Sequence, residues 1–294
     1  MIRRTKGQNI FEVFNYIIMV VIMFTMLYPI LHVIFASLSS PYELMAHQGP
    51  LLHPLKFNVA AYAMVFKNPM IVKGYGNTLF IVIVGTCINI ALTSLAAYVL
   101  SRKNFMPAKV VTVFIVFTMF FQGGLIPSYL NVRDLGLYDS LFAIILPASI
   151  SVFNLIIMRT GFEAIPVSLE ESAKIDGAGH FTILGRIVLP LALPTIAVIV
   201  LYYAVAHWNG WFNAMIYLNT REKFPLQLVL REILIQNDTT NMASSSGVGV
   251  GDQEVVGETI KYAVIVVATL PILFVYPFLQ KYFVKGVMVG AVKG

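Results

Sequence analysis

The stretch that decides the fold is the polar segment Glu171-Ser172-Ala173-Lys174-Ile175-Asp176-Gly177, which is followed after nine residues by Ile187-Val188-Leu189-Pro190. It lies between the fourth and fifth of six apolar runs. In a chain that is otherwise mostly apolar, this segment is the part most accessible to a soluble partner.

Local signals in this segment predict a short helix, a sharp turn and re-entry into the membrane. Ser168 and Glu171 have the spacing of a capping box, so a helix is expected to begin after Pro166. Glu170 and Lys174 stand four residues apart and can pair along one helix face. Gly177 can adopt the left-handed conformation that ends a helix. Further on, Pro190 and Pro194 are placed where a following helix can begin.

Composition identifies a membrane protein. The 294 residues are 58% hydrophobic and 12% charged. Soluble domains have about 45–50% hydrophobic and about 25% charged residues. The net charge of +6 does not indicate a nucleic-acid partner, because the charges bracket the apolar runs and line no folded face. Cys87 stands alone inside an apolar run, so neither a disulfide nor a metal site is expected.

The apolar runs predict an all-α integral membrane protein with six transmembrane helices in a single domain over residues 1–294. A span needs about 20 apolar residues, and the first run is too long for the core of a signal peptide, so it is expected to be a retained anchor. One connecting loop covers 163–189, and two long loops on the opposite side cover 38–77 and 219–261. The predicted spans are 14–37, 78–100, 108–127, 140–162, 190–217 and 262–283.

The distribution of Lys and Arg orients these spans. With six spans, the side that holds both termini and the 163–189 loop carries twelve basic residues, and the other side carries eight. The positive-inside rule then places both termini and this loop in the cytoplasm.

The spacing within the polar segment resembles the cytoplasmic loop of binding-protein-dependent ABC importer permeases. The shared pattern is a Glu-Ala-Ala-like triplet, three residues, a glycine, nine residues, and Ile-x-Leu-Pro. Asp176-Gly177-Ala178 resembles the carbohydrate-importing branch, and Ser172 stands where the family usually has alanine. Four further stretches resemble maltose-type permeases or their oligosaccharide-importing subgroup: Ala96–Arg102, Phe121–Tyr129, Phe153–Thr160 and Gln280–Gly294.

This resemblance implies a type I ABC importer permease fold in the bacterial cytoplasmic (inner) membrane. It implies four partners besides the lipid bilayer: a second homologous permease subunit, a dimer of ATP-binding subunits, an extracytoplasmic solute-binding protein and an oligosaccharide substrate. ATP and Mg would be bound by the ATPase, since this chain has no phosphate-binding loop and is not expected to be an enzyme. The residues implied to contact the ATPase are Glu170, Glu171, Ser172, Ala173, Asp176, Gly177, Ala178, Leu189 and Pro190, with Lys293 and Gly294 of the C-terminal tail.

Polar and aromatic residues near the end of the fifth run are candidates for the substrate path. Amides suit sugar hydroxyls, and indoles stack on the apolar faces of sugar rings. An aromatic belt at the membrane interface explains the same residues equally well, and helix packing is the default explanation for Asn89, Thr93 and Asn154. The path candidates are Trp208, Asn209, Trp211 and Asn213, with the weaker Gln122 and Tyr129.

Two other functional classes remain as alternatives. A membrane component of polysaccharide export that acts as an enzyme would need buried acids or bases. An ion-coupled secondary transporter would need charges at mid-membrane and inverted repeats. The spans carry almost no charged residues, so the importer is favoured over both.

Overall fold

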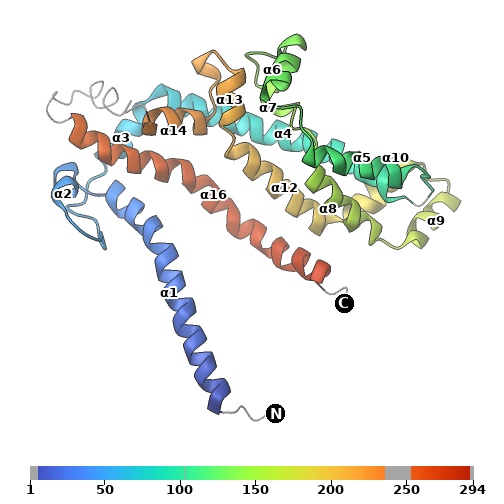
Figure 1. Ribbon diagram of the computed structural model, residues 1–294, viewed down its shortest axis with the longest axis horizontal. Coiled ribbons are helices and arrows are strands. Elements are labelled where there is room, and N and C mark those ends of the chain that lie inside the picture. Colours follow the sequence, from blue (N-terminus) through green and yellow to red (C-terminus); the bar gives the residue numbers. More distant parts are fainter. Residues whose placement is uncertain (1–5, 103, 236–252, 292–294) are drawn as a thin grey trace. The chain divides into compact units, whose positions relative to one another are not determined.

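The computed structural model describes residues 6–102, 104–235 and 253–291, and the regular structure within them is helical throughout. Three helices are long and apolar enough to cross a membrane: α1 (Lys6–Ser37), α4 (Pro69–Ser101) and α16 (Gln253–Ala291) (Figure 1). Up to six spans result if each of three bent helix pairs counts as one.

The remaining helices are shorter and connect or complete these spans. They are α2 (Pro41–Ala46), α3 (Ala60–Lys67), α5 (Ala108–Phe120), α6 (Leu125–Asp134), α7 (Phe142–Ile145), α8 (Val152–Glu163), α9 (Val167–Ile175), α10 (His180–Ile183), the π-helix η1 (Leu184–Val188), α11 (Leu189–Leu191), α12 (Leu193–Trp208), α13 (Phe212–Tyr217), the 3₁₀-helix η2 (Arg221–Lys223) and α14 (Leu226–Ile235).

Several predicted spans are interrupted in the structure where the sequence weakens the helix. The run at 108–127 breaks after Phe120, at Gln122-Gly123-Gly124, where Gly124 has φ +86°, and α5 and α6 are bent by 112°. The run at 140–162 breaks before Pro147, which cannot continue a helix because it lacks an N–H. The run at 190–217 breaks at residues 209–211, between α12 and α13.

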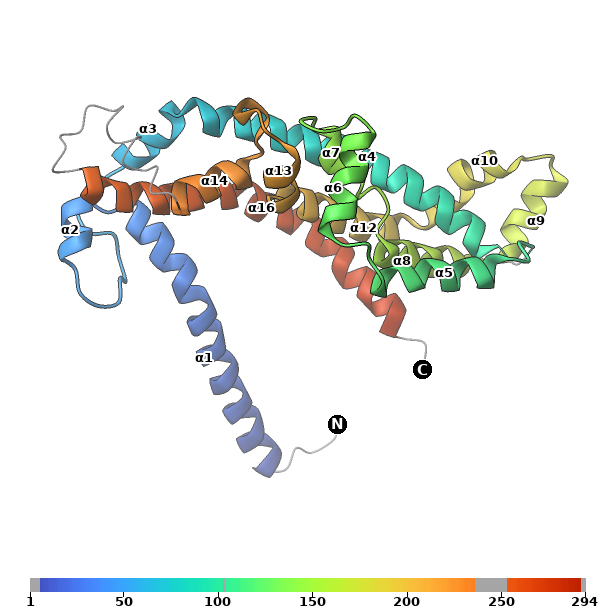
Figure 2. The ribbon, with the colours of Figure 1, turned by 45° about the horizontal axis from the view of Figure 1, so that its top comes forward.

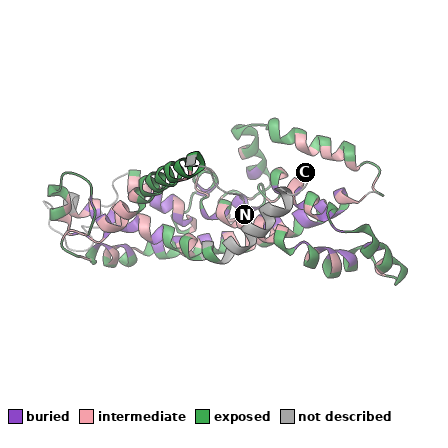
Figure 3. Ribbon diagram, turned by 90° about the horizontal axis from the view of Figure 1, so that it is seen from below, coloured by how far each residue is buried: buried purple, intermediate pink, exposed green. Residues whose placement is uncertain are grey.

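The chain divides into two compact units. The first comprises Met1–Pro69 and Leu230–Thr269, and the second comprises Met70–Val229 and Leu270–Gly294. In the first unit, much of α1 is exposed (Figure 3). Its exposed apolar side chains include Phe14 and Phe24. Exposed apolar surface of this extent is typical of a lipid-facing or partner-facing helix.

The second unit contains the core that supports the polar segment. Buried side chains of α4, α8, α10, η1 and α12 pack together in one cluster, in which Met158, Phe162, Ile183 and Ile199 are fully enclosed. Figures 1 and 2 both show α9 and α10 at the same end of α4 and α5. The segment that carries the polar stretch is therefore held at one end of this helix cluster.

Candidate functional site

Helix α9 begins where the sequence predicts, but not by the predicted mechanism. It starts at Val167, directly after Pro166, and no side chain caps its N-terminus. The capping box predicted from Ser168 and Glu171 is therefore wrong, because Pro166 occupies the N-cap position and Ser168 already lies inside the helix. Proline with an extended conformation ends the preceding segment and sets the start of the helix.

The C-terminal end of α9 is a complete Schellman turn. Gly177 has φ +81°, its N–H donates to the carbonyl of Lys174 at 3.0 Å, and the N–H of Ala178 donates to the carbonyl of Ala173 at 2.9 Å. This pair of bonds satisfies the last helical carbonyls and needs a left-handed residue, which favours glycine. The predicted glycine stop is confirmed.

Two faces of α9 have different roles. Ala173 and, beyond the turn, Ala178 are half-buried against the core cluster. Glu171, Ser172 and Asp176 are exposed. An apolar side chain on this outer face, Ile175, is 87% exposed. The helix thus presents an outer surface with acidic, small and apolar groups and is anchored from beneath by small residues.

Glu170 does not lie on that outer surface. It is only 2% exposed and forms an ion pair with Arg102, which follows the last residue of α4. The predicted pairing of Glu170 with Lys174 is therefore wrong, because Glu170 faces the core side of the helix and Lys174 is exposed. The sequence could not show this, since the partner belongs to a distant segment.

The return limb runs through α10, η1 and α11. The N–H of Leu189 donates to the carbonyl of Leu184, an i to i−5 bond that makes this turn a π-helix. Leu189 is half-buried against the core, and Pro190 is exposed at the first turn of α11. Phe181 is 81% exposed. π-Helical turns are frequent at functional sites.

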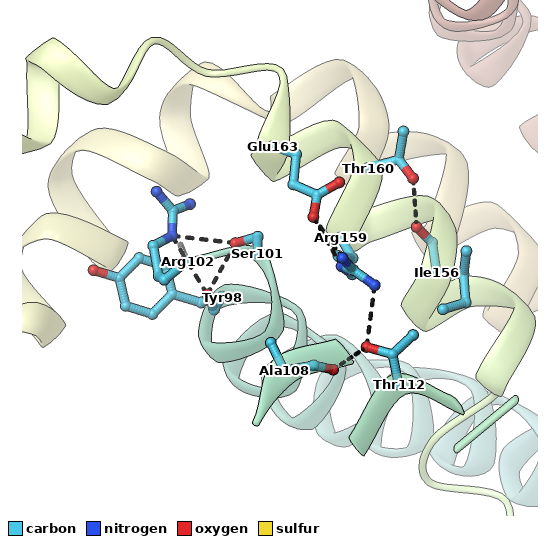
Figure 4. A network of polar contacts seen from close by, with 9 residues as sticks. All are labelled: Tyr98, Ser101, Arg102, Ala108, Thr112, Ile156, Arg159, Thr160 and Glu163. Atoms are coloured by element: carbon cyan, nitrogen blue, oxygen red, sulfur yellow. Dashed lines mark hydrogen bonds and ion pairs between the residues drawn. The ribbon is translucent and has the colours of Figure 1, made fainter. Parts of the chain in front are cut away.

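Two arginines organise the polar contacts at this end of the helices (Figure 4). Arg102 lies 4.7 Å from the centre of the Tyr98 ring and donates to Ser101 Oγ at 3.1 Å. Burial lowers the pKa of Arg102 from its usual value, because desolvation disfavours the charged form. Arg159 bridges Glu163 of its own helix at 2.9 Å and Thr112 of α5 at 3.1 Å.

A separate cavity of about 560 Å³ contains three of the six path candidates. Asn209, Trp211 and Asn213 line it. Trp208 does not, because it is only 7% exposed and packs edge-on against Tyr75, with ring centres 6.2 Å apart.

The two weaker path candidates lie elsewhere. Gln122 is exposed at the break between α5 and α6 and is not among the residues that line the cavity. Tyr129 belongs to an aromatic group with Tyr138 and Tyr217, at ring-centre distances of 6.0 and 6.4 Å. These two residues therefore do not line the cavity that holds Asn209, Trp211 and Asn213.

The cavity is also lined by polar and aromatic residues that are not among the predicted path candidates. Several of these residues fall in α8 and α12, and their facing depends on how the two helices meet. They are Ser151, Phe153, Asn154, Tyr202, Tyr203 and His207. The resemblance of Phe153–Thr160 to oligosaccharide importers was the one signal that could have pointed to Phe153 and Asn154.

Buried hydrogen bonds hold the wall of this cavity. His207 Nε2 lies 2.6 Å from Asn89 Oδ1, while Asn89 Nδ2 donates to the carbonyls of Ala148 and Ser149 at 2.9 and 2.8 Å. Tyr203 joins the same wall through Thr93 at 2.8 Å and the N–H of Ser151 at 2.9 Å. The packing role expected for Asn89 and Thr93 is confirmed, and it fixes α4, α12 and the segment before α8 around the cavity.

Among the described residues, no group of three or more His, Cys, Asp or Glu could hold a metal ion. Lys293 and Gly294 of the predicted tail contact lie outside the described residues.

Comparison with known proteins decides the family. Residues 3–289 match the family model of the binding-protein-dependent transport system inner membrane component. This chain belongs to that family. The match includes residues of both compact units.

Individual relatives agree with this assignment. The permease is 45% identical to the Bacillus subtilis polygalacturonan/rhamnogalacturonan transport system permease protein YtcP, over 90% of this chain and 92% of the relative. It is 41% identical to the Bacillus subtilis protein LplC, over 99% and 97% of the two chains. A crystal structure of a bacterial ABC transporter involved in the import of the acidic polysaccharide alginate matches with a TM-score of 0.87 and 33% identity, over 96% of this chain and 100% of that one.

The predicted fold class and family are thereby confirmed. The permease is an all-α inner membrane protein with the fold of ABC importer permeases. Its family is one of transport components, and this membership favours the importer over the two alternatives, polysaccharide export and ion-coupled transport.

Proposed function

We propose that this permease forms one half of the translocation path of an ATP-driven importer for oligosaccharides. A second permease would supply the other half, an extracytoplasmic binding protein would deliver the saccharide, and a pair of ATPase subunits would bind ATP and Mg in the cytoplasm. YtcP and the alginate importer, whose names specify polysaccharide transport, support a saccharide substrate. Both termini of this chain would then be cytoplasmic, as its Lys and Arg distribution favours.

The observation that carries the proposal is the outer face of α9. Its short helix is closed by the Schellman turn at Gly177 and exposes Glu171, Ser172 and Asp176 together with Ile175. An apolar side chain surrounded by exposed polar groups, at the water-facing end of a membrane protein, is typical of a protein-docking surface. Phe181 adds a second exposed apolar group beyond the turn.

We expect the outer face of α9 to act by contact with the ATPase. Because Ala173 and Ala178 rest on the core cluster that includes α4, α8 and α12, a displacement of α9 is passed to the spans by packing. Closure of the ATPase pair on ATP would thus move the spans without any chemistry in this chain. Glu171 and Asp176 would serve as docking groups.

The cavity supports recognition of sugar hydroxyls and ring faces. Its lining combines the amides of Asn154, Asn209 and Asn213 with aromatic side chains, including Trp211, and none of the described residues that line it is Asp, Glu, Lys or Arg. Amides bond hydroxyl groups as donor and acceptor, and aromatic rings stack on apolar sugar faces.

Co-purification and transport together test the proposal. The permease would be expressed with the second permease, the ATPase and the binding protein, purified through a tag on this chain, and reconstituted into liposomes. We expect the ATPase and the second permease to co-purify, and labelled trigalacturonate or its neutral methyl ester to enter only with ATP and binding protein. Purification of this chain alone in an active form, or uptake driven by an ion gradient without ATP, would refute it.

A further inference from the structure

Two adjacent glutamates of α9 have opposite environments. Glu171 is exposed on the outer face, whereas Glu170 is 2% exposed and paired with Arg102. Successive residues of an α-helix are about 100° apart, so a helix that lies against the core directs the two carboxylates to different sides. Only Glu171 is available to a docking partner.

The partner of Glu170 is itself fixed to the end of a membrane-spanning helix. The Arg102 side chain is 17% exposed, lies over the ring of Tyr98 and donates from Nε to Ser101 Oγ. Tyr98 and Ser101 belong to the last turn of α4. The guanidinium therefore has little freedom to follow Glu170 unless the end of α4 moves with it.

The same turn of α4 also contacts the limb beyond Gly177. The rings of Tyr98 and His180 meet edge-on with centres 6.4 Å apart, and His180 begins α10. Both limbs of the polar loop thus contact one turn of α4, the first through a charge pair and the second through an aromatic contact. The charge pair is the stronger and more directional of the two.

We propose that the Arg102–Glu170 ion pair is the link through which displacement of α9 is transmitted to α4, and that Glu170 is a positioning residue. This inference rests on the proposed coupling to an ATPase. Glu171 contacts the ATPase, and Glu170 transmits the displacement of α9 to α4 through Arg102. Loss of Glu170 should therefore leave docking intact and reduce the number of saccharides moved per ATP.

The chain offers a matched control of the same chemistry. Arg159 and Glu163 form an ion pair within α8, and Arg159 also bonds Thr112 of α5, so this cluster ties α8 to α5 and does not include α9. Glu163→Gln weakens an ion pair at the same end of the helices and leaves both members of the proposed link in place, although the Glu163 carboxylate also acts electrostatically on Arg102. Glu171→Gln serves as the docking comparison.

The test uses the full transporter in liposomes with its binding protein and labelled trigalacturonate. Two quantities are measured for each variant: the ATPase that co-purifies, and the saccharide transported per ATP hydrolysed. For Glu170→Gln and Arg102→Gln, we expect normal co-purification and a fall of about fivefold or more in the transport ratio. We expect Glu163→Gln to retain the wild-type ratio, and Glu171→Gln to lose co-purification.

A double variant separates transmission from simple support of the fold. Arg102→Met with Glu170→Leu replaces the pair by apolar groups, which often preserves stability. We expect a melting temperature close to that of the wild type together with a low transport ratio. A wild-type ratio in this double variant or in Glu170→Gln would overturn the inference, as would loss of ATPase binding by Glu170→Gln. Failure of the wild-type complex to assemble or transport would instead refute the proposed function.

Discussion

Substitution of Gly85 by alanine tests the buried wall of the cavity. Gly85 lies in α4 against the imidazole of His207, and a Cβ built on it would stand 2.6 Å from Nε2 and 2.9 Å from Cε1. To reach an ordinary separation of roughly 3.5 Å, the ring must move by about 1 Å. The ring cannot do so freely, because Nε2 is bonded to Asn89 Oδ1 at 2.6 Å.

The cost follows from these contacts. Forcing a methyl group into a filled site costs about 1–3 kcal/mol. Breaking the His207–Asn89 bond leaves two buried polar atoms unpaired, which adds about 1–3 kcal/mol. The higher helix propensity of alanine offsets about 0.5–1 kcal/mol of this loss. We therefore expect a net loss of about 3 kcal/mol and a melting temperature lower by about 6–12 °C.

Thermal unfolding of the purified complex in detergent measures this loss, with two controls from the same helices. Gly76, also in α4, has no atom within 4 Å of a built Cβ, so Gly76→Ala should be neutral or slightly stabilising. In a His207→Ala background the clash is removed, and Gly85→Ala should then behave like Gly76→Ala. An equal cost of Gly85→Ala in both backgrounds, within about 0.5 kcal/mol, would refute the reasoning.

Three further predictions concern the loop, an ion-paired turn and the cavity. Gly177→Asp should abolish uptake, because a side chain at φ +81° strains the turn that ends α9. Membrane insertion should stay intact, because there is open space around this position; normal uptake with wild-type ATPase stimulation would contradict this prediction. Asp139→Ala should lower the melting temperature, with a loss of about 1–2 kcal/mol, since Asp139 accepts bonds from the Lys223 side chain at 2.8 Å and from two backbone N–H groups at 3.0 Å. The hydrogen bond from Lys223, then those from Thr220 and Asn219, hold the pKa of Asp139 well below its usual 3.8, so the difference from the wild type should persist down to pH 3.8 and shrink only as the pH falls further. Asn213→Ala should reduce uptake with little change in melting temperature, whereas Trp208→Ala should do the reverse, and equal effects of the two on stability would contradict the cavity assignment.

The local backbone of the polar loop could be predicted from sequence, and its tertiary contacts could not. Pro166 and Gly177 fix the two ends of α9 through their own φ angles, so their effect needs no information from elsewhere in the chain. The burial of Glu170 depends on Arg102 and on the rotation of α9 about its axis. Likewise, the sequence places Trp208 close to Trp211, but the contact of Trp208 with Tyr75 of α4 keeps its ring out of the cavity lining.

The pairing of Glu170 also explains why the loop needs a charge on its inner side. An amphipathic helix of nine residues rests on the core through Ala173, and Ala178 adds a contact just beyond it. Such small side chains allow close approach but bury little apolar area, so packing alone would hold α9 weakly. A carboxylate paired with Arg102 adds a directional contact at a fixed point. The outer residues can then serve a partner, because the inner glutamate already fixes the helix to the end of α4.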